Sequence, residues 1–235
     1  GPQPGPRRPR RPAGGVDGRR LGAAGRRAAA RPGAPGLTRA MAPGRVLLDD
    51  GAVLALDKPP GVSMATSGRP GKSEEEVVAR LLSACGAAPG DRPLLVHRLD
   101  EGTSGVVLLA RDAATHRALT RAFQERTARK TYRALAWGHP VPARGIADAP
   151  LGRDPRDGRK MTVREDGKPA VTRWATLRRY ASAADLELAP ETGRTHQIRV
   201  HLAAKGHPLV GDDLYGGGTR SKIGRASCRE RVSVV

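Results

Sequence analysis

Cysteine and long hydrophobic runs are both scarce in this chain of 235 residues, and each scarcity excludes a class of protein. The two cysteines, Cys85 and Cys228, are too few for a disulfide framework or a cysteine-based metal site. No apolar run reaches the length that a membrane-spanning helix needs, so we expect no membrane partner. A reducing, cytoplasmic setting is the default expectation.

Residues 1–40 lack aromatic side chains and have almost no large aliphatic ones, while glycine, proline, alanine and arginine dominate. Such a segment cannot bury enough apolar surface to offset its chain entropy, so we expect a disordered leader. It lacks the apolar core of an export signal, although an arginine-rich leader also suits an organelle transit peptide. We favour Met41 as the natural start, which makes residues 1–40 a non-native extension.

The positive charge is concentrated at the two ends of the chain. Of the formal net charge of +19, about +10 lies in residues 1–45 and +4 in residues 219–235, which leaves +5 for residues 46–218. Residues 223–232 resemble a translated sequencing adapter, so we expect residues 219–235 to be a non-native tail after a truncated gene. The charge therefore supports a nucleic-acid partner only weakly.

Residues 42–218 are long enough for one domain with a sizeable core. Patterns of apolar residues predict strands at 46–48, 53–56, 131–137, 171–177 and 186–188. Many strands with few helices between them predict an α+β fold with a mixed, mainly antiparallel sheet and flanking helices.

Three polar residues mark expected helix starts. Ser73 opens a capping box with Glu76, Asp112 can cap a second helix, and Thr195 can cap a third that ends before Gly206. The side chains that we expect on the inward faces are Val77, Val78, Leu81, Leu82, Ala118, Leu119, Ala122, Phe123, Ile198 and Leu202.

The segment His97–Gly105 displays one carboxylate, Asp100, in a glycine-punctuated loop directly before the apolar run 106–110. Arg98 stands two positions before that carboxylate. An acid between a buried strand and a turn is a candidate for chemistry, although a surface aspartate that starts a turn is the simpler interpretation.

A second polar cluster occupies residues 191–202. Arg194, His196, Gln197 and Arg199 offer many donors near a helix N-terminus, which suits anionic oxygens or base edges. A solvated basic helix face is the simpler alternative. A zinc site is disfavoured because His196 and His201 are five positions apart and no acid lies between them.

Taken together, these segments resemble the pseudouridine synthases of the RluA family, which act on ribosomal and transfer RNA. The matching pieces stand in the family's order: Asp57–Gly61, His97–Asp100 with Thr103–Gly105, Lys130–Tyr132, Gly193–His201 and Gly211–Gly216. The small-subunit rRNA group has related but different motifs and is the second choice. The resemblance implies the pseudouridine synthase type of sheet, with further strands expected beyond residue 218.

The resemblance also implies the reaction: uridine within an RNA becomes pseudouridine without a metal or cofactor. Asp100 matches the catalytic aspartate, which acts either as a nucleophile at C1′ or as a base at the sugar. A cationic partner is needed to keep such a carboxylate ionised, and Arg194 matches that partner. Tyr132 matches the aromatic residue that the family places against the target base.

RNA contacts are implied for a further set of residues. Arg98 suits the space left by an extruded uridine, because a planar guanidinium can stack where a base did. His97, beside Arg98, is also assigned to RNA binding. The weaker assignments, for phosphate contacts or loop support, are Lys58, His196, Gln197 and Arg199.

Two other functions stay open. The chain could be a non-catalytic RNA-binding module, or a hydrolase with paired acids, although Glu101 should diverge from Asp100 on an extended backbone. No apolar periodicity for a separate RNA-binding domain is seen in residues 1–40. A monomer acting on a compact rRNA or tRNA stem-loop is expected.

Overall fold

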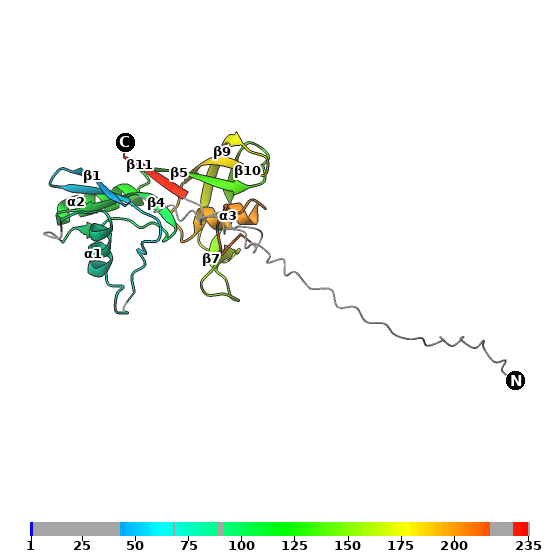
Figure 1. Ribbon diagram of the computed structural model, residues 1–235, viewed down its shortest axis with the longest axis horizontal. Helices are drawn as coiled ribbons and strands as arrows, with labels where there is room; N and C mark the ends of the chain where they lie inside the picture. Colours follow the sequence, from blue (N-terminus) through cyan, green and yellow to red (C-terminus); the bar gives the residue numbers. More distant parts are fainter. Residues whose placement is uncertain (2–42, 68, 89–91, 217–227, 235) are drawn as a thin grey trace, which may run out of the picture. The chain divides into compact units, whose positions relative to one another are not determined.

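The computed structural model describes residues 43–67, 69–88 and 92–216, together with Gly1 and the backbone of Cys228–Val234. Its main feature is a nine-stranded sheet in the order β1-β2-β4-β11-β5-β10-β9-β6, with β3 paired to β4 outside this path (Figure 1). The strands β7 and β8 form a separate pair. The expected α+β fold with a mixed, mainly antiparallel sheet is confirmed.

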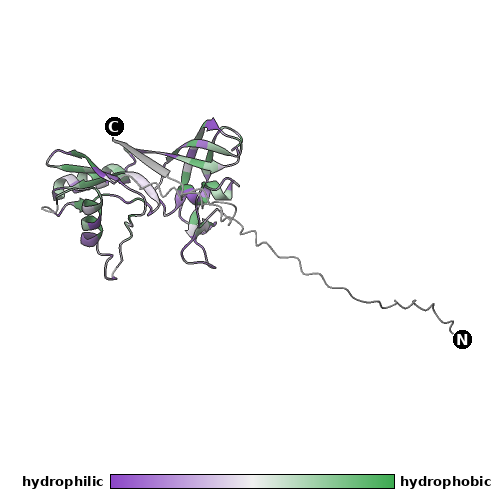
Figure 2. Ribbon diagram, viewed as in Figure 1, coloured by the Kyte–Doolittle hydropathy of each residue, from purple (hydrophilic) through white to green (hydrophobic). Residues whose placement is uncertain are grey.

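The strands are β1 (Arg45–Asp49), β2 (Val53–Lys58), β3 (Leu94–Leu95), β4 (Thr103–Ala110), β5 (Ala128–Trp137), β6 (Arg144–Asp148), β7 (Leu151–Arg153), β8 (Met161–Val163), β9 (Val171–Arg179), β10 (Ala183–Pro190) and β11 (Cys228–Val234). The helices are α1 (Glu74–Ala84), α2 (Ala113–Gln124) and α3 (Gln197–Ala204). Each strand predicted from apolar patterns lies within one of these strands. Figure 2 shows the segment that joins β7 and β8 as hydrophilic.

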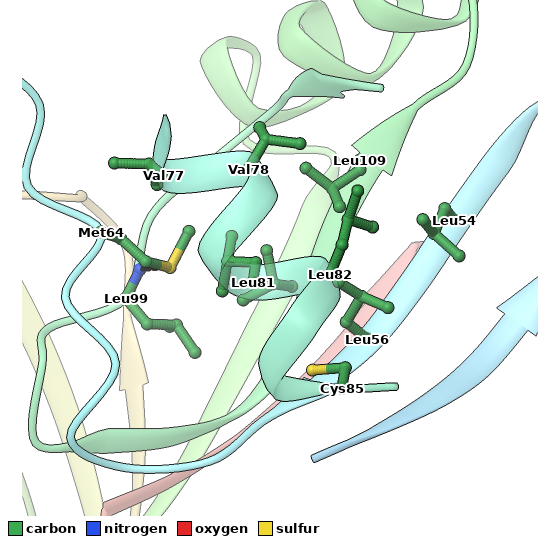
Figure 3. Close-up of a cluster of buried hydrophobic side chains, with 11 residues drawn as sticks. Leu54, Leu56, Met64, Val77, Val78, Leu81, Leu82, Cys85, Leu99 and Leu109 are labelled. Atoms are coloured by element: carbon green, nitrogen blue, oxygen red, sulfur yellow. Dashed lines mark hydrogen bonds between the residues drawn. The ribbon is translucent and has the colours of Figure 1, made fainter. Parts of the chain in front are cut away.

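The first core lies between α1 and the strands β2 and β4. The predicted capping box is confirmed: the Ser73 hydroxyl accepts the Glu76 N–H, and the Glu76 carboxylate accepts the Ser73 N–H. Each fully buried leucine of this core contributes about 2 kcal/mol. Figure 3 shows its members, which are Leu54, Leu56, Met64, Val77, Val78, Leu81, Leu82, Cys85, Leu99, Val107 and Leu109.

The second helix, α2, begins after Asp112 as predicted, but none of its residues is fully buried, in contrast to α1. The Asp112 carboxylate accepts the Thr115 N–H at 2.8 Å. Leu119 and Phe123 are half-buried, whereas Ala118 is exposed, so the prediction was wrong for Ala118. The half-buried residues His116, Leu119, Thr120 and Phe123 follow the i, i+3, i+4, i+7 spacing of one helical face, and Ala118 lies outside that face.

The second core lies on the other part of the sheet, where β5, β10, β9 and β6 pair antiparallel in succession. The helix α3 packs against β9 and β10. Tyr132 on β5 packs against both cores. The buried members of the second core are Ala134, Ala136, Ala147, Trp174, Ala184, Leu186, Leu188, Ile198, Leu202 and Leu209.

The strand β11 connects the two parts of the sheet through its backbone. It pairs parallel with β4 and antiparallel with β5. This strand falls inside residues 219–235, which the sequence predicts to be a foreign tail; residues 219–227 and 235 lie outside the described residues, as do residues 2–40 of the expected leader. Within the described part of the chain, no helix combines the length and the apolar character that crossing a membrane requires.

The third helix begins differently from the prediction. The residue before α3 is His196, in the left-handed region at φ 54°, and its side chain makes no capping hydrogen bond. Thr195 is exposed and is not the cap; instead the Gln197 side-chain oxygen accepts the Arg194 N–H at 3.0 Å. Gly206, at φ 80°, follows the helix end as predicted.

Candidate active site

A cavity of about 640 Å³ opens between the loop before β4 and the loop before α3. It gathers residues from motifs that lie about ninety positions apart in the sequence. Seven of the nine residues expected at the site line it, namely Arg98, Asp100, Tyr132, Arg194, His196, Gln197 and Arg199. Lys58 and His97 are not among its lining residues.

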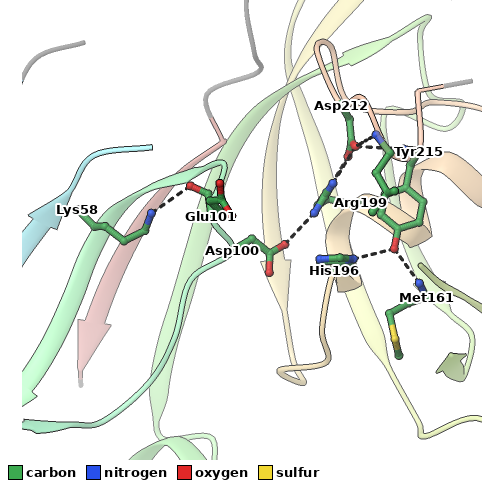
Figure 4. Close-up of polar contacts among 9 residues, drawn as sticks. Lys58, Asp100, Glu101, Met161, His196, Arg199, Asp212 and Tyr215 are labelled. Carbon is green, nitrogen blue, oxygen red and sulfur yellow. Dashed lines mark hydrogen bonds and ion pairs between the residues drawn. The ribbon is translucent and has the colours of Figure 1, made fainter. Parts of the chain in front are cut away.

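Asp100 faces Arg199 across this cavity (Figure 4). The Arg199 Nη1 lies 3.5 Å from the Asp100 Oδ2, and both side chains are partly exposed. Arg199 therefore supplies the cation that the sequence led us to expect beside Asp100. It projects from the first turn of α3, whereas Asp100 lies in the loop that precedes β4.

Arg194 is not the ion-pair partner of Asp100 in this structure, so that expectation was wrong. Its Nε donates to the Pro169 carbonyl at 3.0 Å. Arg194 stands three positions before α3, on the loop, and Arg199 stands on the helix itself. Because the chain turns at His196 before α3 begins, the two arginines lie on different parts of the backbone, and Arg199 is the one that faces Asp100.

The position of Arg199 is fixed by a second carboxylate. Its Nε and Nη2 donate to the two oxygens of Asp212 at 2.8 and 2.9 Å, and the Asp212 side chain is 3% exposed. Burial alone would raise the pKa of Asp212, but the Arg199 hydrogen bonds and charge lower it below its usual range. The Tyr215 ring lies beneath the guanidinium, 5.0 Å from its carbon.

Asp212 and Tyr215 are functional residues to which the sequence analysis gave no role. The signal was available, because both lie in the segment Gly211–Gly216 that matched the family. Asp212 also accepts the N–H groups of Leu214 and Tyr215, so one carboxylate organises this turn and holds the arginine.

His196 is held by Tyr215. Its Nδ1 lies 2.8 Å from the phenol oxygen, which also accepts the Met161 N–H at 2.8 Å. Burial lowers the pKa of His196, so the neutral imidazole is favoured. The Tyr215 hydroxyl therefore links the His196 ring to the backbone of Met161.

Lys58 supports the loops and does not face solvent, so a direct phosphate contact is excluded by its burial. Its Nζ donates to the carbonyls of Pro59, Val62 and Glu101 at 3.0, 3.0 and 3.3 Å. The side chain is fully buried. Burial lowers the pKa of Lys58 to about 8, although the nearby carboxylates of Glu101 and Asp100 oppose this shift. Lys58 thereby ties the strand β2 to the loop that contains Asp100.

His97 also has a structural position instead of an RNA-facing one. Its Nε2 accepts the Leu108 N–H at 3.1 Å, and its ring lies 4.7 Å from the Phe123 ring. Burial and the Lys130 charge lower the pKa of His97 to about 4. A neutral imidazole of this kind fixes the loop before β4.

Gln197 is buried, and its amide is fully engaged within the protein. The oxygen accepts from the Thr192 hydroxyl and the Arg194 N–H, at 2.6 and 3.0 Å. The nitrogen donates to the Val171 carbonyl and the Thr172 hydroxyl. Gln197 therefore anchors the loop 191–196 to β9, which agrees with loop support, one of the two roles expected for it, and its amide is engaged away from any phosphate.

His201, weighed with His196 as a zinc ligand, has both ring nitrogens engaged. One lies 2.9 Å from the Thr172 hydroxyl and the other 3.0 Å from the Ala149 carbonyl. Among the described residues, no group of three histidine, cysteine or acidic side chains is placed to hold a metal ion.

Arg98 and Tyr132 both line the cavity. Arg98 is exposed at the rim, on the same loop as Asp100, and Tyr132 is half-buried on β5. The cavity thus combines a carboxylate held opposite a cation, an aromatic ring and an exposed guanidinium. Such a set can activate a sugar carbon, contact a planar base and pair with phosphate oxygens.

Comparisons with known proteins agree with this arrangement. A family model described as RNA pseudouridylate synthase matches residues 52–204. The chain is similar to the dual-specificity RNA pseudouridine synthase RluA of Escherichia coli O6:H1, with 40% identity over 172 residues, or 72% of this chain and 76% of that protein. An uncharacterized RNA pseudouridine synthase of Chloroflexus aurantiacus is 50% identical over 125 residues, covering 53% of this chain.

Among solved structures, human RNA pseudouridylate synthase domain containing 1 superposes with a TM-score of 0.66 at 29% identity, covering 81% of this chain and 78% of that one. The chain spans 39% to 56% of the length of several curated relatives, including the Chloroflexus protein.

Proposed function

The chain belongs to the RNA pseudouridylate synthase family, and from this premise we propose that it isomerises uridine to pseudouridine within a structured rRNA or tRNA. The observation that carries the proposal is the Asp100 carboxylate held opposite Arg199 in the 640 Å³ cavity. As expected from the sequence, we propose that the enzyme acts as a monomer in the cytoplasm.

The proposed reaction needs no oxidant, reductant or second substrate. The C1′–N1 bond of the uridine breaks, the uracil rotates, and C1′ bonds to C5. The hydrogen on C5 leaves as a proton and N1 gains one, so the atoms balance. Asp100 acts either as the nucleophile at C1′ or as the base at the ribose, and both roles require an ionised carboxylate.

The other residues assist Asp100 by position. Arg199 places a positive charge beside the reacting carboxylate, and Asp212 fixes the orientation of Arg199. Tyr132 lies where it can pack on the uracil ring, and Arg98 at the rim can fill the stacking position that the extruded uridine leaves. Arg194, free of the ion-pair role, faces the RNA backbone at the cavity edge.

The substitution Asp100→Asn tests the catalytic assignment. It keeps the size of the side chain and removes the negative charge, so we expect pseudouridine formation to fall by about 10⁴-fold or more. Glu101→Gln is the matched control, because it neutralises the adjacent, exposed carboxylate. The readout is tritium release from RNA labelled at uracil C5, with RNA binding measured in parallel.

Three results would contradict this proposal. Undiminished tritium release by Asp100→Asn would remove Asp100 from the chemistry. Binding without any pseudouridine formation by the parent chain would favour a non-catalytic RNA-binding module. Release of free uracil would indicate a hydrolase. Mapping of pseudouridines in rRNA and tRNA with and without the gene then identifies the target.

A further inference from the structure

A second cavity, of about 540 Å³, adjoins the catalytic one. The two cavities share a wall formed by Lys130, Pro190, Thr192, Gly193 and Arg194. We call the second cavity the basic groove and define it by its lining residues: Phe123, Gln124, Arg126, Ala128, Arg129, Lys130, Thr131, Ala189, Pro190, Glu191, Thr192, Gly193 and Arg194. It runs from the shared wall to the end of α2 and the start of β5.

The charges that line the basic groove are almost all positive. Arg126, Arg129, Lys130 and Arg194 contribute four cations. Glu191 is the single acid among the lining residues, and its carboxylate accepts a hydrogen bond from Arg173. Its charge is thus already compensated, so the groove has a net positive potential that attracts anions.

Arg126 occupies a position that usually belongs to glycine. It follows the α2 end in the left-handed region at φ 61°, and the next N–H, of Thr127, donates to the Ala122 carbonyl at 3.0 Å. This is the Schellman pattern, in which glycine avoids the steric cost of a positive φ. The chain therefore presents a guanidinium into the groove at a place where a side chain costs stability.

Arg126 and Arg129 are also available to a ligand. Both are exposed, and neither guanidinium forms an ion pair or hydrogen bond within the part of the chain that the structure describes. Arg194 uses its Nε for the Pro169 carbonyl, and its remaining N–H groups are at the shared wall. Other surface arginines, such as Arg121 and Arg159, are paired with neighbouring acids.

We propose that the basic groove binds the sugar–phosphate backbone of the RNA strand that flanks the target uridine. This inference rests on the proposed function. A strand with its uridine at Asp100 continues across the shared wall, where Lys130 and Arg194 meet the first phosphate beyond the catalytic cavity. Arg126 and Arg129 then bind the next phosphates, because guanidinium groups pair with phosphate oxygens in a bidentate manner. Such contacts hold the strand irrespective of its sequence.

The test measures salt-dependent binding of a fluorescein-labelled short oligouridylate by the full chain. The variants are Arg126→Gly and Arg129→Gln, and the matched control is Arg117→Gln, an exposed arginine of α2 that lines neither cavity. Between about 50 and 200 mM salt, we expect each groove variant to reduce the slope of log K against log salt by about 0.7. Its affinity should fall about 3- to 10-fold at the lower salt, whereas the control should match the parent.

Arg126→Gly separates binding from folding. Because glycine suits the left-handed backbone, the midpoint of thermal unfolding should equal or exceed that of the parent, although RNA binding weakens. Arg129→Gln is the second variant, at a position where no backbone strain is involved.

Three results would overturn the assignment of the basic groove to RNA, and a fourth would overturn the proposed function. Unchanged slopes in both groove variants would remove the groove from RNA binding, and so would the same loss in Arg117→Gln, which would assign the effect to total charge. Equal competition by polyglutamate of matched charge would assign the groove to acidic protein segments. A parent that binds through the groove but forms no pseudouridine would overturn the proposed function alone.

Discussion

Arg194 and Arg199 illustrate how much the surroundings of a residue decide. Both lie in one basic segment, and the sequence pointed to Arg194 as the partner of Asp100. In the structure Arg199 takes that place, because Asp212 holds its guanidinium toward the Asp100 loop. Burial decides in the same way for Lys58: of the two roles expected for it, phosphate contact or loop support, its fully buried ammonium, which donates to three backbone carbonyls, leaves loop support.

Asp212→Asn should disturb both the site and the fold. The substitution removes the buried charged partner of the half-buried Arg199 guanidinium and leaves only the partly exposed Asp100 opposite, so we expect the free energy of unfolding to fall by about 2–3 kcal/mol. A misplaced Arg199 should slow pseudouridine formation about 10²-fold. Denaturant unfolding and tritium release measure the two effects. Asp213→Asn, at the exposed neighbour, is the control and should stay within about 0.5 kcal/mol.

The buried Lys58 makes a pH-dependent contribution to stability. Its pKa is about 8 in the folded chain and 10.5 when unperturbed, so the unfolded state binds more protons between these pH values. The free energy of unfolding therefore rises with pH in this window, by about 3 kcal/mol. Below pH 8 the full cost of burying the charge is present.

The comparison that isolates this term is the parent against Lys58→Met, with both unfolded in denaturant from pH 7 to about pH 10.5. Subtraction removes the titration of all other groups. The parent should gain stability relative to the variant as the pH rises, and parallel curves would show that Lys58 titrates normally.

At the scale of elements, short sequence patterns predicted a helix start correctly wherever the capping side chain lies directly before its own helix. The start of α1 at Ser73 and the start of α2 at Asp112 were predicted from short spacings and are confirmed. The start of α3 was predicted wrongly: Thr195 is exposed, and the loop before α3 is held through the Gln197 amide, which donates to Val171 and Thr172 of β9. These partners lie 26 and 25 positions from Gln197, so no local pattern indicates them.

Ser73→Ala tests the contribution of the α1 cap. The hydroxyl accepts the Glu76 N–H at 3.2 Å, and its loss should lower the free energy of unfolding by about 1 kcal/mol. The same substitution at Ser83, exposed on α1, should change it by less than about 0.5 kcal/mol. Equal effects at the two positions would mean that the cap does not stabilise the helix.

At the scale of the whole molecule, much of the net positive charge lies outside the residues that form the buried cores. The buried clusters that form the cores lie between residues 54 and 209. Residues 1–39 contribute ten arginines and one aspartate. Residues 1–39 thus carry +9 of the formal net charge of +19, so about half of the positive charge lies outside the part of the chain that contains Asp100.

Removal of residues 1–39 should leave the thermal midpoint within about 2 °C, because no core residue is lost. The formal net charge falls from +19 to +10, so RNA binding should weaken and its salt dependence should become shallower. Thermal unfolding and oligouridylate titration measure these effects. A large fall in the midpoint would show that the leader is part of the folded domain.

The sequence by itself predicted strands that lie within β1, β2, β5, β9 and β10, the first two helix starts, the α+β class and the family, and it singled out Asp100 for the proposed chemistry. These features depend on short spacings and on the residues that chemistry requires, which are visible along the chain. Only the tertiary structure decided that β11 joins β4 and β5, that Arg199 faces Asp100, and that Lys58 and Gln197 are internal supports. The reason is physical: each of these depends on contacts between segments far apart in sequence, and a side chain's partner, burial and charge state are set where those segments meet.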